Sequence, residues 1–295
     1  MGVILMLLAS ASFATMAAMI KALGPDLPVS QLVFLRCAIA TPFLLAVLFH
    51  RKQPFIVKAR KLLLARTFLG VLAMHCFFYA LTHMELASCI FIGRTQPLLL
   101  ALLAPLFLKE KTPPIAWLAI TTGLLGVALI MNPSAQWSFA AVVALGGAAF
   151  SAGVHLLIRR LNRTDQPMVI VFNFTVLTGL ATGLRSIPGF IMLSGQQWLL
   201  IIGVALFASL GQILMTSAYR HDRAPVVAAA SYSSVVLSVL YGYLFWKETP
   251  VHLAWLGGLL IVSGGLLLVR SRYRVSEPTG IIEASLAREE INEKK

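Results

Sequence analysis

Long apolar runs separated by short polar breaks fill most of this 295-residue chain. Because a helix rises about 1.5 Å per residue, about 20 apolar residues cross the hydrocarbon core of a bilayer. The breaks hold turn-forming pairs such as Gly24-Pro25, Pro113-Pro114 and Asn132-Pro133. The pattern predicts ten transmembrane helices, at residues 3–22, 29–49, 62–82, 87–108, 114–131, 137–158, 167–187, 197–218, 225–246 and 253–270.

The second half of the chain repeats the first at a fixed offset of 138 residues. Residues 106–110 read LFLKE and residues 244–248 read LFWKE, while residues 116–118 and 254–256 both read AWL. Such self-similarity indicates duplication of a structural unit. We therefore divide the chain into a first five-helix repeat (1–131), a second five-helix repeat (137–270) and a polar cytoplasmic tail (271–295).

The distribution of Lys and Arg predicts how the helices are oriented, because cytoplasmic loops carry the excess of these residues. One set of alternate loops holds only Lys21, Arg185 and Lys247. We assign sixteen residues to the other set: Arg51, Lys52, Lys58, Arg60, Lys61, Arg66, Lys109, Lys111, Arg159, Arg160, Arg163, Arg220, Arg223, Arg270, Arg272 and Arg274. This asymmetry predicts a multi-pass protein of the cell (inner) membrane with both termini in the cytoplasm.

A repeat with five spans, an odd number, places its second copy upside down relative to the first. Inverted repeats are typical of secondary transporters, whose substrate site lies near the bilayer midplane between the two copies. The predicted fold is therefore an all-α membrane protein, with ten transmembrane helices arranged as two inverted five-helix repeats.

Composition narrows the functional classes. With 59% hydrophobic and 12% charged residues, the chain has too little polar surface for a soluble globule. Its net charge of +13 comes from residues that punctuate apolar runs, so we predict no nucleic-acid binding. The three cysteines lie inside apolar runs, which predicts neither a disulfide framework nor a metal site.

Sequence motifs of enzymes are absent from the chain. It has no G-x-S-x-G, no H-E-x-x-H and no carboxylate pair within a span, and the six histidines are scattered. It also lacks the G-x-x-x-x-G-K-[ST] loop of ATP-driven pumps. We predict a carrier without cofactors that works by facilitated diffusion, exchange or a histidine-mediated proton step. A membrane-embedded enzyme and a channel or receptor are the alternatives.

The repeat, Arg36 in the second span and the stretch Pro97–Glu110, with Glu248 ending the matching span, together resemble EamA-type members of the drug/metabolite transporter superfamily. The resemblance covers about residues 1–270. It implies alternating-access transport of a small organic metabolite, and a cavity between helices 1, 3, 4, 6, 8 and 9. Val235 stands where the first copy has Pro97, so we expect a straighter ninth helix.

Arg94 is the leading candidate for a substrate contact. It lies about seven residues inside the fourth span, where a charge costs about 2.5 to 3.5 kcal/mol unless it faces water or a partner. The alternative is a side chain that snorkels to the outer interface. Its repeat mate is Tyr232. We expect Arg94 to be the only deep charge around the site, which predicts an anionic or zwitterionic substrate, amino acid-like or vitamin- or nucleotide-like.

Further polar residues could line the same cavity. His75 and Tyr79 are four residues apart on one helix face, and His155 and Gln212 belong to the sixth and eighth spans. Each could instead form polar contacts between helices.

Other polar residues fit structural roles at helix ends. We interpret Arg36 as a cap for helix termini, and we expect Glu110 and Glu248 to pair at the interface beside Lys109 and Lys247. A coupling-ion role for the two acids is the alternative. Small residues in the fifth and tenth spans indicate close helix packing, either inside the protein or across a homodimer.

Overall fold

The computed structural model describes residues 1–99, 102, 114–130, 139–222, 227 and 230–270. Within these ranges the chain forms helices and no strand. The helices are α1 (Gly2–Leu23), α2 (Val29–His50), α3 (Arg60–His83), α4 (Leu86–Gly93), α6 (Pro114–Ile130), α7 (Phe139–Leu161), α8 (Pro167–Ser186), α9 (Gly195–His221), α11 (Ser233–Trp246) and α12 (His252–Arg270). The predicted all-α architecture is confirmed for this part of the chain.

Six of these helices, α1, α2, α3, α7, α8 and α9, are long and apolar enough to cross a membrane. Shorter apolar helices occupy residues 117–130, 233–246 and 252–267. Eight of the helices begin and end within a few residues of the predicted spans, whereas α4 ends at Gly93 and α11 begins at Ser233, well inside the predicted fourth and ninth spans. The predicted tail and most of the second half of the predicted fourth span lie outside the described residues.

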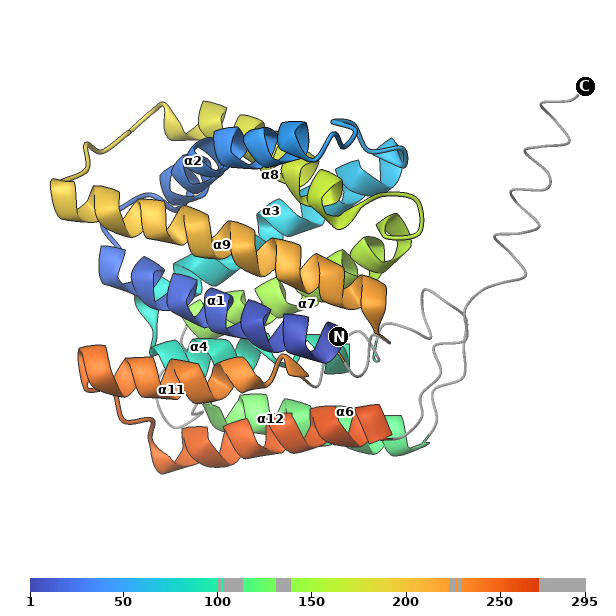
Figure 1. Cartoon of the computed structure of the whole chain (residues 1–295). Coiled ribbons are helices and arrows are strands. Elements are labelled where there is room, and N and C mark those ends of the chain that lie inside the picture. The colour runs from blue at the N-terminus through green and yellow to red at the C-terminus, as the bar shows by residue number, and fades with distance from the viewer. Residues whose placement is uncertain (100–101, 103–113, 131–138, 223–226, 228–229, 271–295) are drawn as a thin grey trace, which may run out of the picture.

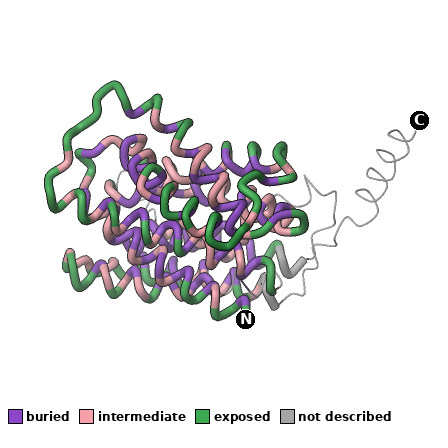
Figure 2. Tube along the Cα trace, turned by 45° about the horizontal axis from the view of Figure 1, so that its top comes forward, coloured by how far each residue is buried: buried purple, intermediate pink, exposed green. Residues whose placement is uncertain are grey.

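Exposed residues lie on the outward faces of the helices, while the faces that meet one another are buried (Figure 2). Many of the exposed residues are large and apolar. Phe49 on α2 is 76% exposed and Leu184 on α8 is 78% exposed. Water would strongly disfavour so much exposed hydrocarbon, whereas lipid accepts it. The surface therefore fits a protein embedded in a bilayer.

The helices lie side by side, from α2 and α8 at one edge of the bundle to α6 and α12 at the other (Figure 1). The main contacts pair α1 with α9, α3 with α7, α2 with α8 and α6 with α12. Each pair is antiparallel; for example, the amide of Val3 donates to Asp222 beyond the end of α9, whereas Met19 packs on Gly203. Under the 138-residue offset, α2 is equivalent to its own partner α8, and α6 is equivalent to its own partner α12. The same offset relates α1 to α7 and α3 to α9, so the pair α1 and α9 is equivalent to the pair α7 and α3.

Two helices are interrupted at positions of the two halves that are equivalent to within one residue. Turn residues 94–95 follow α4, and turn residues 231–232 precede α11. The amides of Thr95 and Val235 each bond to a carbonyl three residues earlier, at 3.0 Å. Pro97 explains the first interruption, since its ring disfavours helical geometry just before it. The second turn has no proline, because Val235 stands at the position of Pro97. The ninth predicted helix is nevertheless interrupted, so the absence of the proline does not make it continuous.

Glycines bring α6 and α12 into close contact. A side chain at Gly126 would collide with the backbone of Gly257, and one at Gly264 would collide with Ala119. These two contacts are equivalent under the 138-residue offset. The small residues thus pack the two helices against each other, and the homodimer remains a prediction.

This packing predicts that Gly126→Leu lowers thermal stability. Overpacking a tight contact typically costs about 1 to 3 kcal/mol, here because α6 and α12 must separate. The matched control is Gly146→Leu on α7, where a Cβ meets nothing within 4 Å. Melting temperatures of the two variants in detergent should differ clearly, and equal values would contradict the tight contact.

Candidate functional site

A cavity of about 180 Å³ lies between the helices near the middle of the bundle. This volume is enough for several water molecules or a small organic group. Its walls come from α1, α3, α4, α7, α9 and α11 and from residues just after α4 and just before α11. These correspond to the first, third, fourth, sixth, eighth and ninth predicted spans, which are the helices that the family resemblance implied. The structure adds Arg36 from α2 and Phe174 from α8, two helices expected to lie outside the site.

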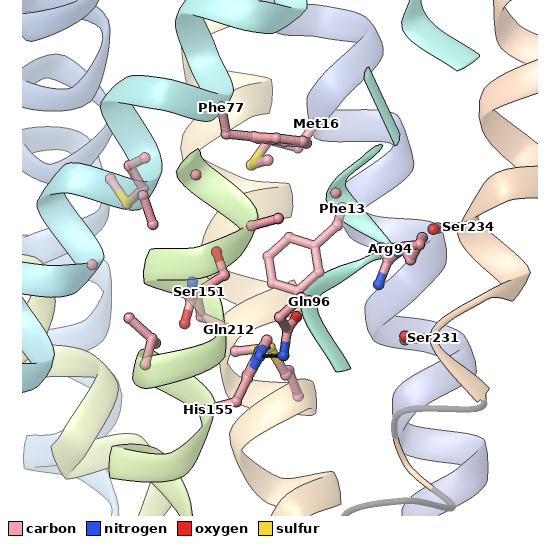
Figure 3. A pocket seen from close by; sticks show the side chains of 18 of the residues that line it. Phe13, Met16, Phe77, Arg94, Gln96, Ser151, His155, Gln212, Ser231 and Ser234 are labelled. Atoms are coloured by element: carbon pink, nitrogen blue, oxygen red, sulfur yellow. Dashed lines mark hydrogen bonds between the residues drawn. The ribbon is translucent and has the colours of Figure 1, made fainter. Parts of the chain in front are cut away.

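The cavity is lined by equivalent positions of the two halves. Both members of these pairs, each separated by 138 residues, contribute to its wall: Phe13 and Ser151, Met16 and Val154, Arg36 and Phe174, Met74 and Gln212, Phe77 and Met215, Gly93 and Ser231, and Gln96 and Ser234. Figure 3 shows Gln96, Ser151, His155 and Gln212 on one side and Arg94, Ser231 and Ser234 on the other, with the Phe13 ring between them.

Arg94 immediately follows α4 and lines the cavity. Its guanidinium makes no hydrogen bond or ion pair with any residue that the structure describes. Its backbone carbonyl accepts a hydrogen bond of 3.3 Å from the hydroxyl of Tyr232, which is buried and packs against Gly265 of α12. Tyr232 therefore holds the turn that carries Arg94, while it is not itself among the lining residues.

His155 on α7 joins the polar side of the cavity. Its Nδ1 contacts Nε2 of Gln96, and its Nε2 lies 3.1 Å from Sδ of Met215. Its ring also lies 5.2 Å from the Tyr219 ring. Among the described residues, no group of three His, Cys, Asp or Glu side chains could hold a metal ion.

Gln212 binds a residue that the sequence analysis placed wrongly. Its Oε1 accepts a hydrogen bond of 3.0 Å from Nη2 of Arg66. Arg66 is not in a cytoplasmic loop: it is the seventh residue of α3 and is 0% exposed. It was missed because it follows a run of loop cations, although Gly70, Ala73 and Phe77 share its helical face and line the cavity with it. Removing it from the loop count barely changes the charge asymmetry.

Arg36 also reaches the cavity, so Arg94 is not the only deep charge around the site. The Arg36 side chain is buried, and its Nη2 lies 3.6 Å from the sulfur of Cys37 and 3.5 Å from that of Met74. Sulfur is a weak acceptor and compensates a guanidinium poorly. Arg36, Arg66 and Arg94 all belong to the first half of the chain. The equivalent positions in the second half hold uncharged residues: Phe174, Val204 and Tyr232.

His75 and Tyr79 lie on α3 but not among the residues that line the cavity. Nδ1 of His75 lies 2.9 Å from the carbonyl of Val71 in its own helix. Tyr79 stacks on His83, with ring centroids 4.0 Å apart. The structure thus brings Arg94, His155 and Gln212 together and leaves these two residues aside.

Glu248 pairs with a residue other than the expected neighbour. Its Oε1 lies 2.5 Å from Nζ of Lys21 at the end of α1, and its Oε2 accepts a bond of 3.0 Å from the amide of Leu86. Lys21 also donates to the carbonyl of Met84, at 2.8 Å. Lys247, with φ of 56°, instead approaches the Tyr243 ring. Glu110 lies outside the described residues.

The family that matches this chain and two of its named relatives are all transporters. The EamA-like transporter family matches residues 1–132 and again residues 138–270. The Pseudopaline exporter CntI of Pseudomonas aeruginosa (strain UCBPP-PA14) is 33% identical over 277 residues, covering 92% of this chain and 96% of that protein. A Riboflavin transporter of Vibrio cholerae serotype O1 is 30% identical over 202 residues, covering 68% of each. A crystal structure shares the fold, with a TM-score of 0.68, 17% identity and coverage of 94% and 99%.

Proposed function

Because the chain belongs to the EamA-like transporter family, we propose that this small-molecule transporter carries an anionic or zwitterionic metabolite by alternating access, through the cavity that holds Arg94. It is a transporter and not an enzyme. Two relatives named for pseudopaline export and riboflavin transport fit a small organic metabolite as the cargo.

The observation that carries this proposal is the guanidinium of Arg94, which has no partner among the described residues and lies in a largely apolar cavity. A charge at this depth requires a partner, and no carboxylate lines the cavity in the described part of the chain. A carboxylate or phosphate of the substrate supplies that partner through charge-assisted hydrogen bonds. The neighbouring Phe13 offers an apolar surface for the rest of the molecule.

Alternating access rests on the inverted repeat, which several features support. The family matches the chain twice, and equivalent helices such as α6 and α12 pack antiparallel. The wall of the cavity combines equivalent positions of the two halves, and the hydroxyl of Tyr232 bonds to its own equivalent, Arg94. Transporters of this design rock one half against the other around a central site.

The two ends of the cavity differ. Lys21 and Glu248 tie together the end of α1, the connection between α3 and α4, and the residues after α11. The lining residues of α9, Gln212, Met215 and Tyr219, come instead from the helix end farthest from this ion pair. In the proposed orientation, with both termini in the cytoplasm, the ion pair lies on the outer side of the cavity.

Counterflow in proteoliposomes tests the proposal. Vesicles that hold the protein and an unlabelled acidic metabolite should accumulate the labelled form transiently, because only a carrier exchanges bound substrate. Amino acids, organic acids and acidic heterocycles form the panel, and protein-free vesicles are the control. If neutral and cationic compounds exchange while every anion and zwitterion fails, the proposed substrate class is wrong.

The proposed orientation, in a cell (inner) membrane, is tested separately. A reporter fused after Arg274 should be active only if it functions in the cytoplasm, because the loops rich in Lys and Arg remain inside. A second fusion between α8 and α9, after Gly189, serves as the opposite-side control. Reversed activities of the two fusions would contradict the orientation.

A further inference from the structure

Arg66 is the most deeply buried cation described in this protein. It is 0% exposed, on a helix long and apolar enough to cross a membrane, and it lines the cavity. Only one of its nitrogens, Nη2, donates a hydrogen bond to a described residue, to Gln212. Its Nε and Nη1 are buried and have no hydrogen-bond partner among the described residues.

The surroundings of Arg66 hold the guanidinium in place without neutralising it. The guanidinium carbon lies 3.4 Å from the centroid of the Phe174 ring. Gly70, one turn along α3, leaves room for the Phe174 ring, since a Cβ there would lie 2.8 Å from it. Arg36 adds a second positive charge within electrostatic range. Such a side chain is oriented and desolvated, and it needs an anion.

Arg66 and Arg94 serve different parts of the cavity. Gln212, the partner of Arg66, lies with Ser151 on one side of Phe13, and Arg94 lies on the other (Figure 3). His155 is within electrostatic range of both arginines. One carboxylate at Arg94 would leave Arg66 without a counter-charge.

We propose that Arg66 and Gln212 form a second anion subsite, so that the transported metabolite carries two acidic groups, one bound by Arg94 and the other by Arg66. This inference rests on the proposed function and adds the requirement that the substrate has a second acidic group. Gln212 aligns the guanidinium and Phe174 covers its face, which leaves Nε and Nη1 for the second acidic group. The section of substrate between its acids packs along Phe13 and Phe77.

Matched pairs of acids provide the test on purified protein in detergent. Each pair joins a monocarboxylate to the dicarboxylate of equal length, from butyrate and succinate to octanoate and suberate, with benzoate and terephthalate as a rigid pair. Affinity is obtained from the rise in melting temperature with ligand concentration. We expect the best-fitting dicarboxylate to bind about tenfold to a hundredfold more tightly than its partner, the value of one charge-assisted hydrogen bond.

Arg66→Met should abolish this preference and leave monocarboxylate affinity within about twofold, because the Arg94 contact is separate. Without ligand, the variant should melt at the same or a higher temperature, since a buried, uncompensated charge has been removed. Arg185→Met, which replaces an exposed arginine on α8, should change neither property. A lower melting temperature for Arg66→Met would assign Arg66 to the fold and overturn the subsite.

The remaining outcomes separate this inference from the proposed function. Binding of monocarboxylates with no preference for any dicarboxylate would overturn the second subsite and leave the Arg94 site standing. A preference for dicarboxylates that survives in Arg66→Met would also overturn it. Failure of every acid in both series would contradict the anion site as a whole.

Discussion

Arg94→Gln is expected to weaken binding of the transported metabolite by about tenfold or more. A charge-assisted hydrogen bond contributes about 1.5 to 3 kcal/mol, and glutamine offers neither the charge nor the planar fork of donors. The effect should be close to its full size, because the Arg94 guanidinium has no competing partner among the described residues. Substrate titrations followed by melting temperature or by counterflow rate measure it.

Two comparisons make this prediction specific to the side chain. Arg94→Lys should retain part of the affinity, since lysine keeps the charge and loses the bidentate geometry. Tyr232→Phe removes only the hydroxyl that bonds to the Arg94 carbonyl, so it should disturb the turn and change affinity less than Arg94→Gln. Unchanged affinity in a folded Arg94→Gln protein would show that the guanidinium snorkels away from the substrate.

Glu248→Gln is expected to lower stability by about 3 kcal/mol, the lower end of the range for breaking a buried ion pair. The side chains of Lys21 and Glu248 are 12% and 18% exposed, so little solvent screens their contact. The substitution leaves the Lys21 charge with a carbonyl and an aromatic ring as its remaining partners. The loss should be measured as reduced expression and a lower melting temperature in detergent, with substrate affinity nearly unchanged.

A double substitution provides the control for Glu248. Lys21→Met combined with Glu248→Gln removes both charges, so it should recover much of the stability lost in Glu248→Gln alone. Full stability of Glu248→Gln together with lost transport would contradict the structural role and place Glu248 in the transport mechanism.

The sequence by itself determined the features that depend on the thickness of the hydrocarbon core and on the order of residues along the chain. Apolar runs of about 20 residues located the long helices to within a few residues, because a bilayer admits few other structures. The repeat indicated which positions are equivalent, and the intramembrane arginine Arg94 pointed to the cavity, since a charge at that depth needs a reason.

Partners of side chains required the tertiary structure, because residues far apart in the chain supply them. Arg66 lies inside the predicted third span, but its burial against Gln212 and Phe174 depends on two other helices, α9 and α8. Lys21 and Glu248 are separated by 227 positions, and the adjacent Lys247 was the nearer candidate along the chain.

The sequence also could not show which face of a helix points into the cavity. His75 and Tyr79 share a helical face as the 3.6-residue period requires, yet the rotation of α3 turns them away from the cavity that Arg66 and Phe77 line. Periodicity states which residues lie together on a helix, whereas packing against the neighbouring helices decides which face meets the site.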